Sequence, residues 1–118
     1  MKSVTINRSL RLIDDPGTGH NRWHPDIEPI LEAAPGEEVV LETRDASDGQ
    51  TKPGVLEPKP TKAIHPLTGP VYVQGAEPGD LLEIEYLDII PESYGWTRVR
   101  PGAGFLKDVI DHPLLVNW

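Results

Sequence analysis

Proline and glycine constrain the fold of this chain more than any other residue types. The sequence holds 13 prolines and 11 glycines among 118 residues, whereas the two together make up about 12 % of an average protein. Because proline lacks a backbone donor and clashes with the preceding helical turn, prolines spread along the whole chain leave little room for long helices. The sequence therefore predicts a mainly β fold of short strands and ordered loops, with little helix.

Charge and composition exclude several classes of partner and chemistry. Eleven Lys and Arg stand against 19 Asp and Glu, for a net charge of −8, which argues against a nucleic-acid or membrane partner. No cysteine is present, so this chain supplies no disulfide, thiolate ligand or cysteine nucleophile. No apolar run approaches the roughly 18 residues of a membrane span and the start has no signal-peptide layout, so we expect a cytoplasmic protein.

Strand patterns recur along the chain. Residues 2–13 alternate apolar and polar side chains, which is typical of a half-buried strand. The segments 35–43 and 78–86 both read Pro-Gly-acid followed by a β-type run, and 71–73 adds a short strand. The length is that of one domain, so we expect a single β-rich unit over residues 1–118.

The chain ends on apolar residues, at positions 113–118. Proteins seldom present Leu, Leu, Val and Trp to water, so we expect this end to pack against something that the chain lacks. The chain would then be part of a larger polypeptide or assembly. The alternative is that the end folds back onto its own core.

An acidic segment follows the strand predicted at 35–43. Glu42 and Asp45 stand where the strand runs out into a loop, a position that holds a carboxylate rigidly and suits a general base or a hard metal ligand. The alternative is an acidic turn in which Asp45 and Asp48 cap backbone amides and Gly49 takes a positive φ.

A second candidate segment is His65-Pro66-Leu67-Thr68-Gly69-Pro70. Its prolines bracket a Thr-Gly pair directly after a histidine, which can fix an imidazole and two amides in the directions that oxyanion stabilisation needs. It could equally be a rigid connection into the next strand.

Two further histidines lie four residues apart in a loop. In a loop, a spacing of four residues does not bring His20 and His24 onto one helical face, so it does not predict a metal-binding pair. A hydrogen-bonding role for each histidine is the simpler interpretation. Trp23 between them is either a packing anchor or a surface for a ligand.

Several segments taken in order resemble one family. These are residues 20–26 (HNRWHPD), 42–50 (ETRDASDGQ), 65–73 (HPLTGPVYV) and 75–80 (GAEPGD), followed by 95–96 and 101–105. Together they are similar to the N-terminal part of the acetamidase/formamidase family. That resemblance implies a β-rich fold of stacked, β-sandwich-like sheets and hydrolysis of small linear amides such as formamide or acetamide to ammonia and a carboxylate. It also implies a homo-oligomer and a divalent metal, zinc or calcium.

Known members of the family are considerably longer. Their downstream half includes a histidine- and acid-containing segment that this sequence does not have. The resemblance therefore implies the N-terminal part of a longer amidase, or one half of a split or cleaved enzyme. Its partners would be a small amide and the C-terminal half or a companion chain.

The resemblance gives the candidate residues provisional roles. Water is the favoured nucleophile, with Glu42 and Asp45 as carboxylates and His65 as proton carrier. Asp45 and His65 are the candidate metal ligands. Thr68 and Gly69 would orient the amide carbonyl, and Trp23 is the aromatic candidate for contact with the substrate.

All of these roles require the acidic strand end and the proline-bracketed turn to meet at one pocket. Two alternatives to an enzyme stay open. The chain could be a non-catalytic structural or assembly half, or a small-molecule or metal-binding β-module that functions alone.

Overall fold

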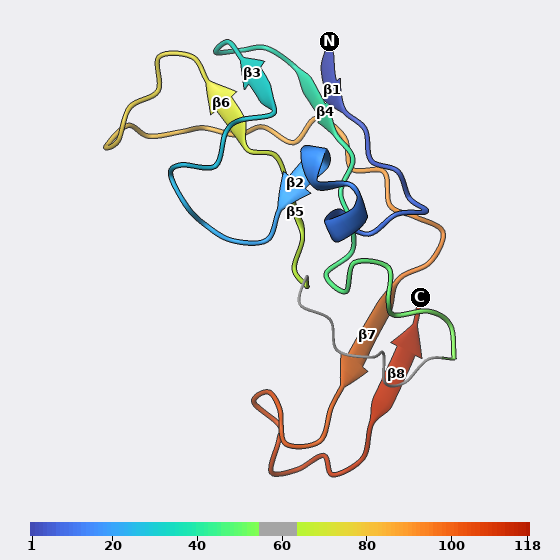
Figure 1. Ribbon diagram of the computed structural model, residues 1–118. Coiled ribbons are helices and arrows are strands. Elements are labelled where there is room, and N and C mark those ends of the chain that lie inside the picture. Colours follow the sequence, from blue (N-terminus) through green and yellow to red (C-terminus); the bar gives the residue numbers. More distant parts are fainter. Residues whose placement is uncertain (55–63) are drawn as a thin grey trace. The chain divides into compact units, whose positions relative to one another are not determined.

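The computed structural model describes residues 1–54 and 64–118 and is built almost entirely from short strands (Figure 1). The strands are β1 (Lys2–Val4), β2 (Gly19–His20), β3 (Leu31–Ala33), β4 (Val39–Leu41), β5 (Leu67–Thr68), β6 (Val71–Val73), β7 (Trp96–Val99) and β8 (Leu114–Asn117). Two short 3₁₀ turns, η1 (Leu12–Asp14) and η2 (Pro16–Thr18), are the helical elements of the described residues. The mainly β class with little helix is confirmed. No helix in the described ranges is long and apolar enough to cross a membrane.

The eight strands form four two-stranded sheets. β1 pairs with β4 and β3 with β6, both in parallel, while β2 pairs with β5 and β7 with β8 in antiparallel. The three sheets within residues 1–73 each join two segments that lie far apart in the sequence. In one of them His20 is the register partner of Leu67, which brings the histidine loop to the proline-bracketed turn.

The described residues divide into two compact units. Unit 1 comprises residues 1–49 and 64–83, with β1 to β6, and unit 2 comprises residues 50–54 and 84–118, with β7 and β8. The single unit expected over residues 1–118 stays a prediction.

The core of unit 1 is small. The buried apolar side chains of the described residues are Val4, Ile6, Leu12 and Ala33. The strand expected over residues 2–13 was only partly right, because ladder pairing stops at Val4 and a 3₁₀ turn begins at Leu12. The alternation nevertheless identified three of the four buried residues. Asp48 holds the Leu12 amide, and that bond replaces a strand partner there.

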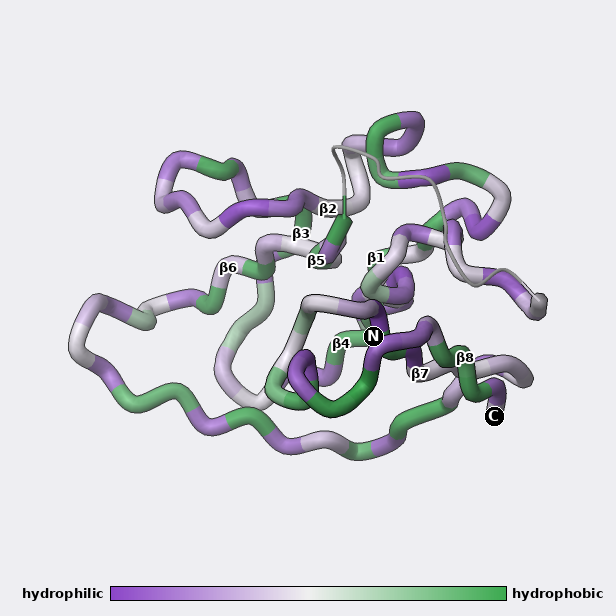
Figure 2. The backbone as a smooth tube through the Cα atoms, turned by 90° about the horizontal axis from the view of Figure 1, so that it is seen from below, coloured by the Kyte–Doolittle hydropathy of each residue, from purple (hydrophilic) through white to green (hydrophobic). Residues whose placement is uncertain are grey.

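The strand expected at 78–86 has no ladder partner among the described residues. The chain here is nevertheless extended, and Figure 2 shows apolar and polar residues alternating along the long stretch between β6 and β7. Its side chains are exposed: Leu81 by 97 %, Tyr86 by 77 % and Ile90 by 86 %. We call residues 81–90 the apolar segment.

Candidate functional site

The acidic strand end and the proline-bracketed turn lie side by side in unit 1. The Thr68 hydroxyl donates to the Glu42 carbonyl oxygen at 2.7 Å, and the His65 amide donates to the Ala46 carbonyl oxygen at 2.9 Å. The predicted convergence of these two segments is confirmed. Sheet pairing of β2 with β5 adds the histidine loop to the same place.

Backbone conformation fixes this arrangement locally. His65 has a φ of +57° and Gly69 a φ of +119°, so the turn between them enters and leaves through left-handed backbone. Gly19 in β2 is required by close approach, because a Cβ there would lie 2.2 Å from the Leu67 carbonyl oxygen. The amide of Gly69 also donates to the Thr18 carbonyl oxygen at 3.4 Å.

A pocket of about 510 Å³ opens where the three segments meet. It is lined by His20, Trp23, His24, Thr43, Pro66, Leu67, Thr68, Pro70 and Val71. Of the predicted site residues, Trp23 and Thr68 line this pocket. Trp23 is 88 % exposed and so is not a packing anchor of unit 1. The other four predicted residues are near neighbours in the chain but are not part of the lining.

Glu42 is held by the segment that follows β1. Its Oε2 accepts the Ile6 amide at 2.9 Å, and its Oε1 lies 3.5 Å from Arg8 Nη2. The carboxylate therefore secures residues 6–8, while its backbone carbonyl holds Thr68. Its role as a catalytic base stays a prediction.

Asp45 caps its own turn. Its Oδ1 accepts the amide and the hydroxyl of Ser47, at 2.8 and 2.5 Å, and its Oδ2 accepts the Gly49 amide at 2.6 Å. Gly49 has a φ of +74°. This is the acidic turn of the alternative interpretation, and the catalytic and metal-binding roles of Asp45 stay predictions, as does the role of exposed His65.

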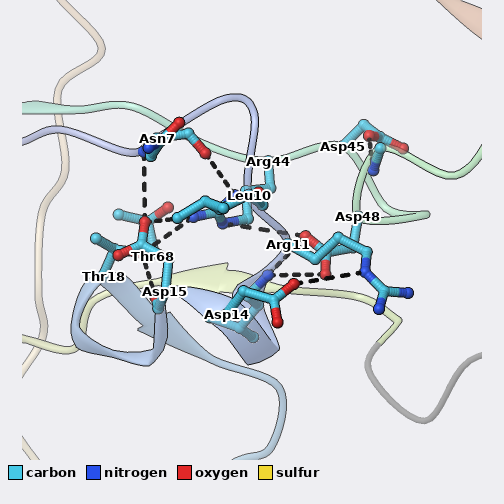
Figure 3. A network of polar contacts seen from close by, with 12 residues as sticks. Asn7, Leu10, Arg11, Asp14, Asp15, Thr18, Arg44, Asp45, Asp48 and Thr68 are labelled. Carbon is cyan, nitrogen blue, oxygen red and sulfur yellow. Dashed lines mark hydrogen bonds and ion pairs between the residues drawn. The ribbon is translucent and has the colours of Figure 1, made fainter.

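Sequence reasoning missed a polar network centred on the buried side chain of Arg44 (Figure 3). Arg44 Nη2 lies 2.7 Å from Asp15 Oδ2, and its Nη1 donates to the carbonyl oxygens of Leu10 and Asn7. Thr18 donates its hydroxyl to the Asp15 carbonyl oxygen at 2.9 Å. The network ties the end of β4 to the chain that leads into β2, so it positions His20 through the backbone.

Asp48 forms the second half of this network. Both of its carboxylate oxygens accept the Leu12 amide, at 3.1 and 2.9 Å, and Oδ1 lies 4.0 Å from Arg44 Nε. The side chains of Arg44 and Asp48 are only 6 % and 1 % exposed. The sequence does show that charged residues are dense at 42–50. That density does not reveal which of the charged side chains are buried.

The histidines of the pocket are hydrogen-bonded, as expected. His20 Nδ1 lies 2.7 Å from the Arg22 carbonyl oxygen, and the Asp26 amide donates to His24 Nδ1 at 3.2 Å. In each case a backbone group two residues later in the sequence contacts Nδ1 and so orients the imidazole ring.

The described residues do not by themselves fit a metal ion. Within ranges 1–54 and 64–118, no three His, Asp or Glu side chains gather closely enough to hold one. Both carboxylate oxygens of Asp45 already accept bonds from within its own turn. The zinc or calcium that the resemblance implies stays a prediction.

Comparison with known proteins gives consistent matches along the whole chain. A family model described as the Acetamidase/Formamidase family matches residues 5–118. Curated relatives include an acetamidase of Mycolicibacterium smegmatis, 37 % identical over 98 % of this chain and 32 % of the relative. A formamidase of Methylophilus methylotrophus is 34 % identical over 98 % of this chain and 31 % of the relative.

A solved structure agrees with these matches. The gamma lactamase from Delftia acidovorans superimposes with a TM-score of 0.88 and 32 % sequence identity, covering 100 % of this chain and 31 % of that one. The chain thus spans about a third of the length of the relatives that it matches.

Proposed function

Because the chain belongs to the acetamidase/formamidase family, we propose that it forms part of an amidohydrolase acting on small linear amides such as formamide or acetamide. The observation that carries this proposal is the 37 % identity to an acetamidase along 98 % of the chain. No observation favours the alternatives of a non-catalytic half or an independent binding module.

The chemistry is a net addition of water across the carbon–nitrogen bond. Water attacks the carbonyl carbon, the tetrahedral intermediate collapses with cleavage of that bond, and the departing nitrogen takes a proton to leave as ammonia beside a carboxylate. Amide resonance makes the attack slow in water, so a catalyst has to activate the nucleophile, stabilise the oxyanion and protonate the nitrogen. Glu42, Asp45 and His65 are the proposed proton-transfer groups.

The lining of the pocket offers the apolar and polar groups that a short amide needs. Its walls are largely apolar, from Trp23, Leu67, Val71 and two prolines, and its polar groups are imidazoles and threonine hydroxyls. A short acyl group can occupy the apolar part while the amide faces the polar side chains.

We further propose that the active enzyme needs the rest of the family's length, as a C-terminal half or as a companion chain. The chain spans 32 % of one relative, and its apolar segment exposes Leu81, Tyr86 and Ile90 by 97, 77 and 86 %. Exposed apolar runs of this kind mark surfaces that bind other protein. A cytoplasmic homo-oligomer stays a prediction.

The proposed catalytic groups are tested in the complemented enzyme, formed by mixing this chain with a polypeptide that carries the remaining two thirds of a family member. Asp45→Asn and His65→Ala should each lower the kcat for ammonia release from formamide by about 100-fold or more. Asp14→Asn and His112→Ala are matched controls, because both side chains are more than half exposed. Near-normal kcat in both test variants would contradict the assigned roles.

A further inference from the structure

The two imidazoles of the pocket present opposite hydrogen-bonding groups. We propose, on the basis of the proposed function, that His20 and His24 form a recognition pair for a carboxamide that carries an N–H. His20 Nε2 accepts from the amide nitrogen, and the Nε2–H of His24 donates to the carbonyl oxygen. The contact that each Nδ1 already makes determines which of these roles its Nε2 can take.

His20 is fixed as a hydrogen-bond acceptor at Nε2. Its Nδ1 lies 2.7 Å from the Arg22 carbonyl oxygen, and a carbonyl oxygen only accepts, so Nδ1 carries the proton. In the neutral ring the lone pair then lies on Nε2. His20 is half-buried and belongs to β2, where pairing with Leu67 holds its backbone.

His24 is fixed as a donor at Nε2. Its Nδ1 accepts the Asp26 amide at 3.2 Å, so in the neutral ring the proton lies on Nε2. The Asp26 carboxylate lies 3.7 Å from the same Nδ1 and is 86 % exposed on its side chain. If the ring were protonated beside this carboxylate, Nε2 would still carry a proton. His24 therefore offers a donor in either state.

The other polar groups of the lining are two threonines. The Thr68 hydroxyl already donates to the Glu42 carbonyl oxygen, so its proton is not available to a ligand in this geometry. Thr43 lies at the exposed end of the acidic segment. The imidazoles thus offer a donor and an acceptor fixed by their own Nδ1 contacts, whereas the Thr43 hydroxyl can rotate to donate or accept.

This pattern matches an amide and rejects its close analogues. A primary or secondary amide has one acceptor oxygen and at least one N–H donor, so it satisfies both rings. A carboxylate has only acceptors and would place an oxygen against the lone pair of His20, which disfavours the reaction product. Esters and N,N-dialkyl amides lack the N–H and leave His20 unpaired.

Binding to the full chain tests the proposal without requiring turnover. Nuclear magnetic resonance titrations with acetamide compare the wild-type chain with His20→Phe, with His24→Phe and with His112→Phe, a control outside the pocket. Loss of one hydrogen bond should weaken acetamide binding about fivefold in each of the first two variants and leave the control unchanged. His24→Gln, which restores a donor, should recover most of the affinity.

N,N-dimethylacetamide has no N–H and cannot donate to His20, so it distinguishes the proposed hydrogen bond from apolar contact with the pocket. It should bind the wild-type chain more weakly than acetamide, and His20→Phe should not weaken it further. Nitrogen-15 spectra of labelled histidine should show the proton of neutral His20 on Nδ1. Equal binding of the two amides, unchanged acetamide binding by His20→Phe, no measurable acetamide binding, or a protonated Nε2 in neutral His20 would each overturn the proposal.

Failure of this pair and failure of the hydrolase proposal are distinguishable. If the complemented enzyme releases ammonia but the His20 variants bind acetamide normally, recognition lies elsewhere. If acetamide binds as expected but no ammonia is released in the presence of the companion polypeptide, the proposed hydrolysis is wrong and the recognition pair stands.

Discussion

The network around Arg44 and the apolar segment reverse the usual distribution of side chains. Arg44 and Asp48 are charged yet only 6 % and 1 % exposed, whereas Leu81 and Ile90 are apolar yet 97 % and 86 % exposed. Charge is buried only where partners compensate its desolvation, and apolar groups exposed in a run mark a surface for other protein. Arg44 and Asp48 thus have polar partners within the chain, whereas the side chains of Leu81 and Ile90 are largely uncovered by the described residues.

Removing a charge from the network should produce the largest effect on stability. Asp48→Ala removes the acceptor of the buried Leu12 amide and one of the two carboxylates beside the Arg44 guanidinium, while Asp15 stays 2.7 Å from that guanidinium. We expect a loss of about 1–3 kcal/mol in the free energy of unfolding, measured by urea titration, because the buried amide is left without a partner. Alanine at a φ of +56° adds to that cost.

The control for this prediction is Asp14→Ala. Asp14 is 55 % exposed on its side chain and lies 3.9 Å from Arg11, so its loss should cost less than about 1 kcal/mol. An Asp48→Ala chain as stable as the Asp14→Ala chain would mean that the network does not stabilise the fold.

Polar substitutions in the apolar segment should leave the chain's own stability nearly unchanged. Ile84 and Ile90 are 65 % and 86 % exposed, so Ile84→Ser with Ile90→Ser should alter the free energy of unfolding by less than about 0.5 kcal/mol per site. The same double variant should weaken binding of the companion polypeptide by tenfold or more in a pull-down titration, because the apolar area is lost.

Ile13→Ser is the matched control for the apolar segment, since Ile13 is 61 % exposed but lies on η1. It should bind the companion polypeptide as the wild type does. If the Ile84 and Ile90 substitutions strongly destabilised the free chain, these two side chains could not be as exposed as the structure has them.

A small pH effect should arise at the edge of unit 1. The Lys2 ammonium, 2.9 Å from Glu37 Oε2, and then the Ala34 amide lower the pKa of the Glu37 carboxyl below its ordinary value of 4.5. A lowered folded pKa means that this contribution to stability is present above the unfolded pKa and is lost as pH falls through the folded pKa. Urea midpoints should therefore fall less steeply below pH 4.5 in Glu37→Gln than in the wild type, and identical slopes would contradict this.

Sequence reasoning reached the fold class and the meeting of the two site segments, and it did so for physical reasons. Prolines spread along the chain interrupt long helices, and the alternation at Val4, Ile6 and Leu12 identified buried positions even where no ladder formed. The end of a strand and a turn fixed by prolines can both be recognised from a few consecutive residues.

The directions of the charged side chains could not be predicted in the same way. Whether Asp45 faces a pocket or caps Ser47 and Gly49 depends on the left-handed backbone of its turn. Arg44 turns inward because Asp15, nearly thirty residues away, supplies its carboxylate, and no local pattern encodes that pairing.

The decisive measurement is ammonia release from formamide and acetamide while the companion polypeptide is titrated into a fixed concentration of this chain. We predict no release above background by the chain alone, followed by a rise that saturates at an equimolar ratio and is lost in the Ile84 and Ile90 double variant. Full activity of the chain alone would contradict the need for a companion. No activity at any ratio, although the two polypeptides bind, would contradict the hydrolase itself.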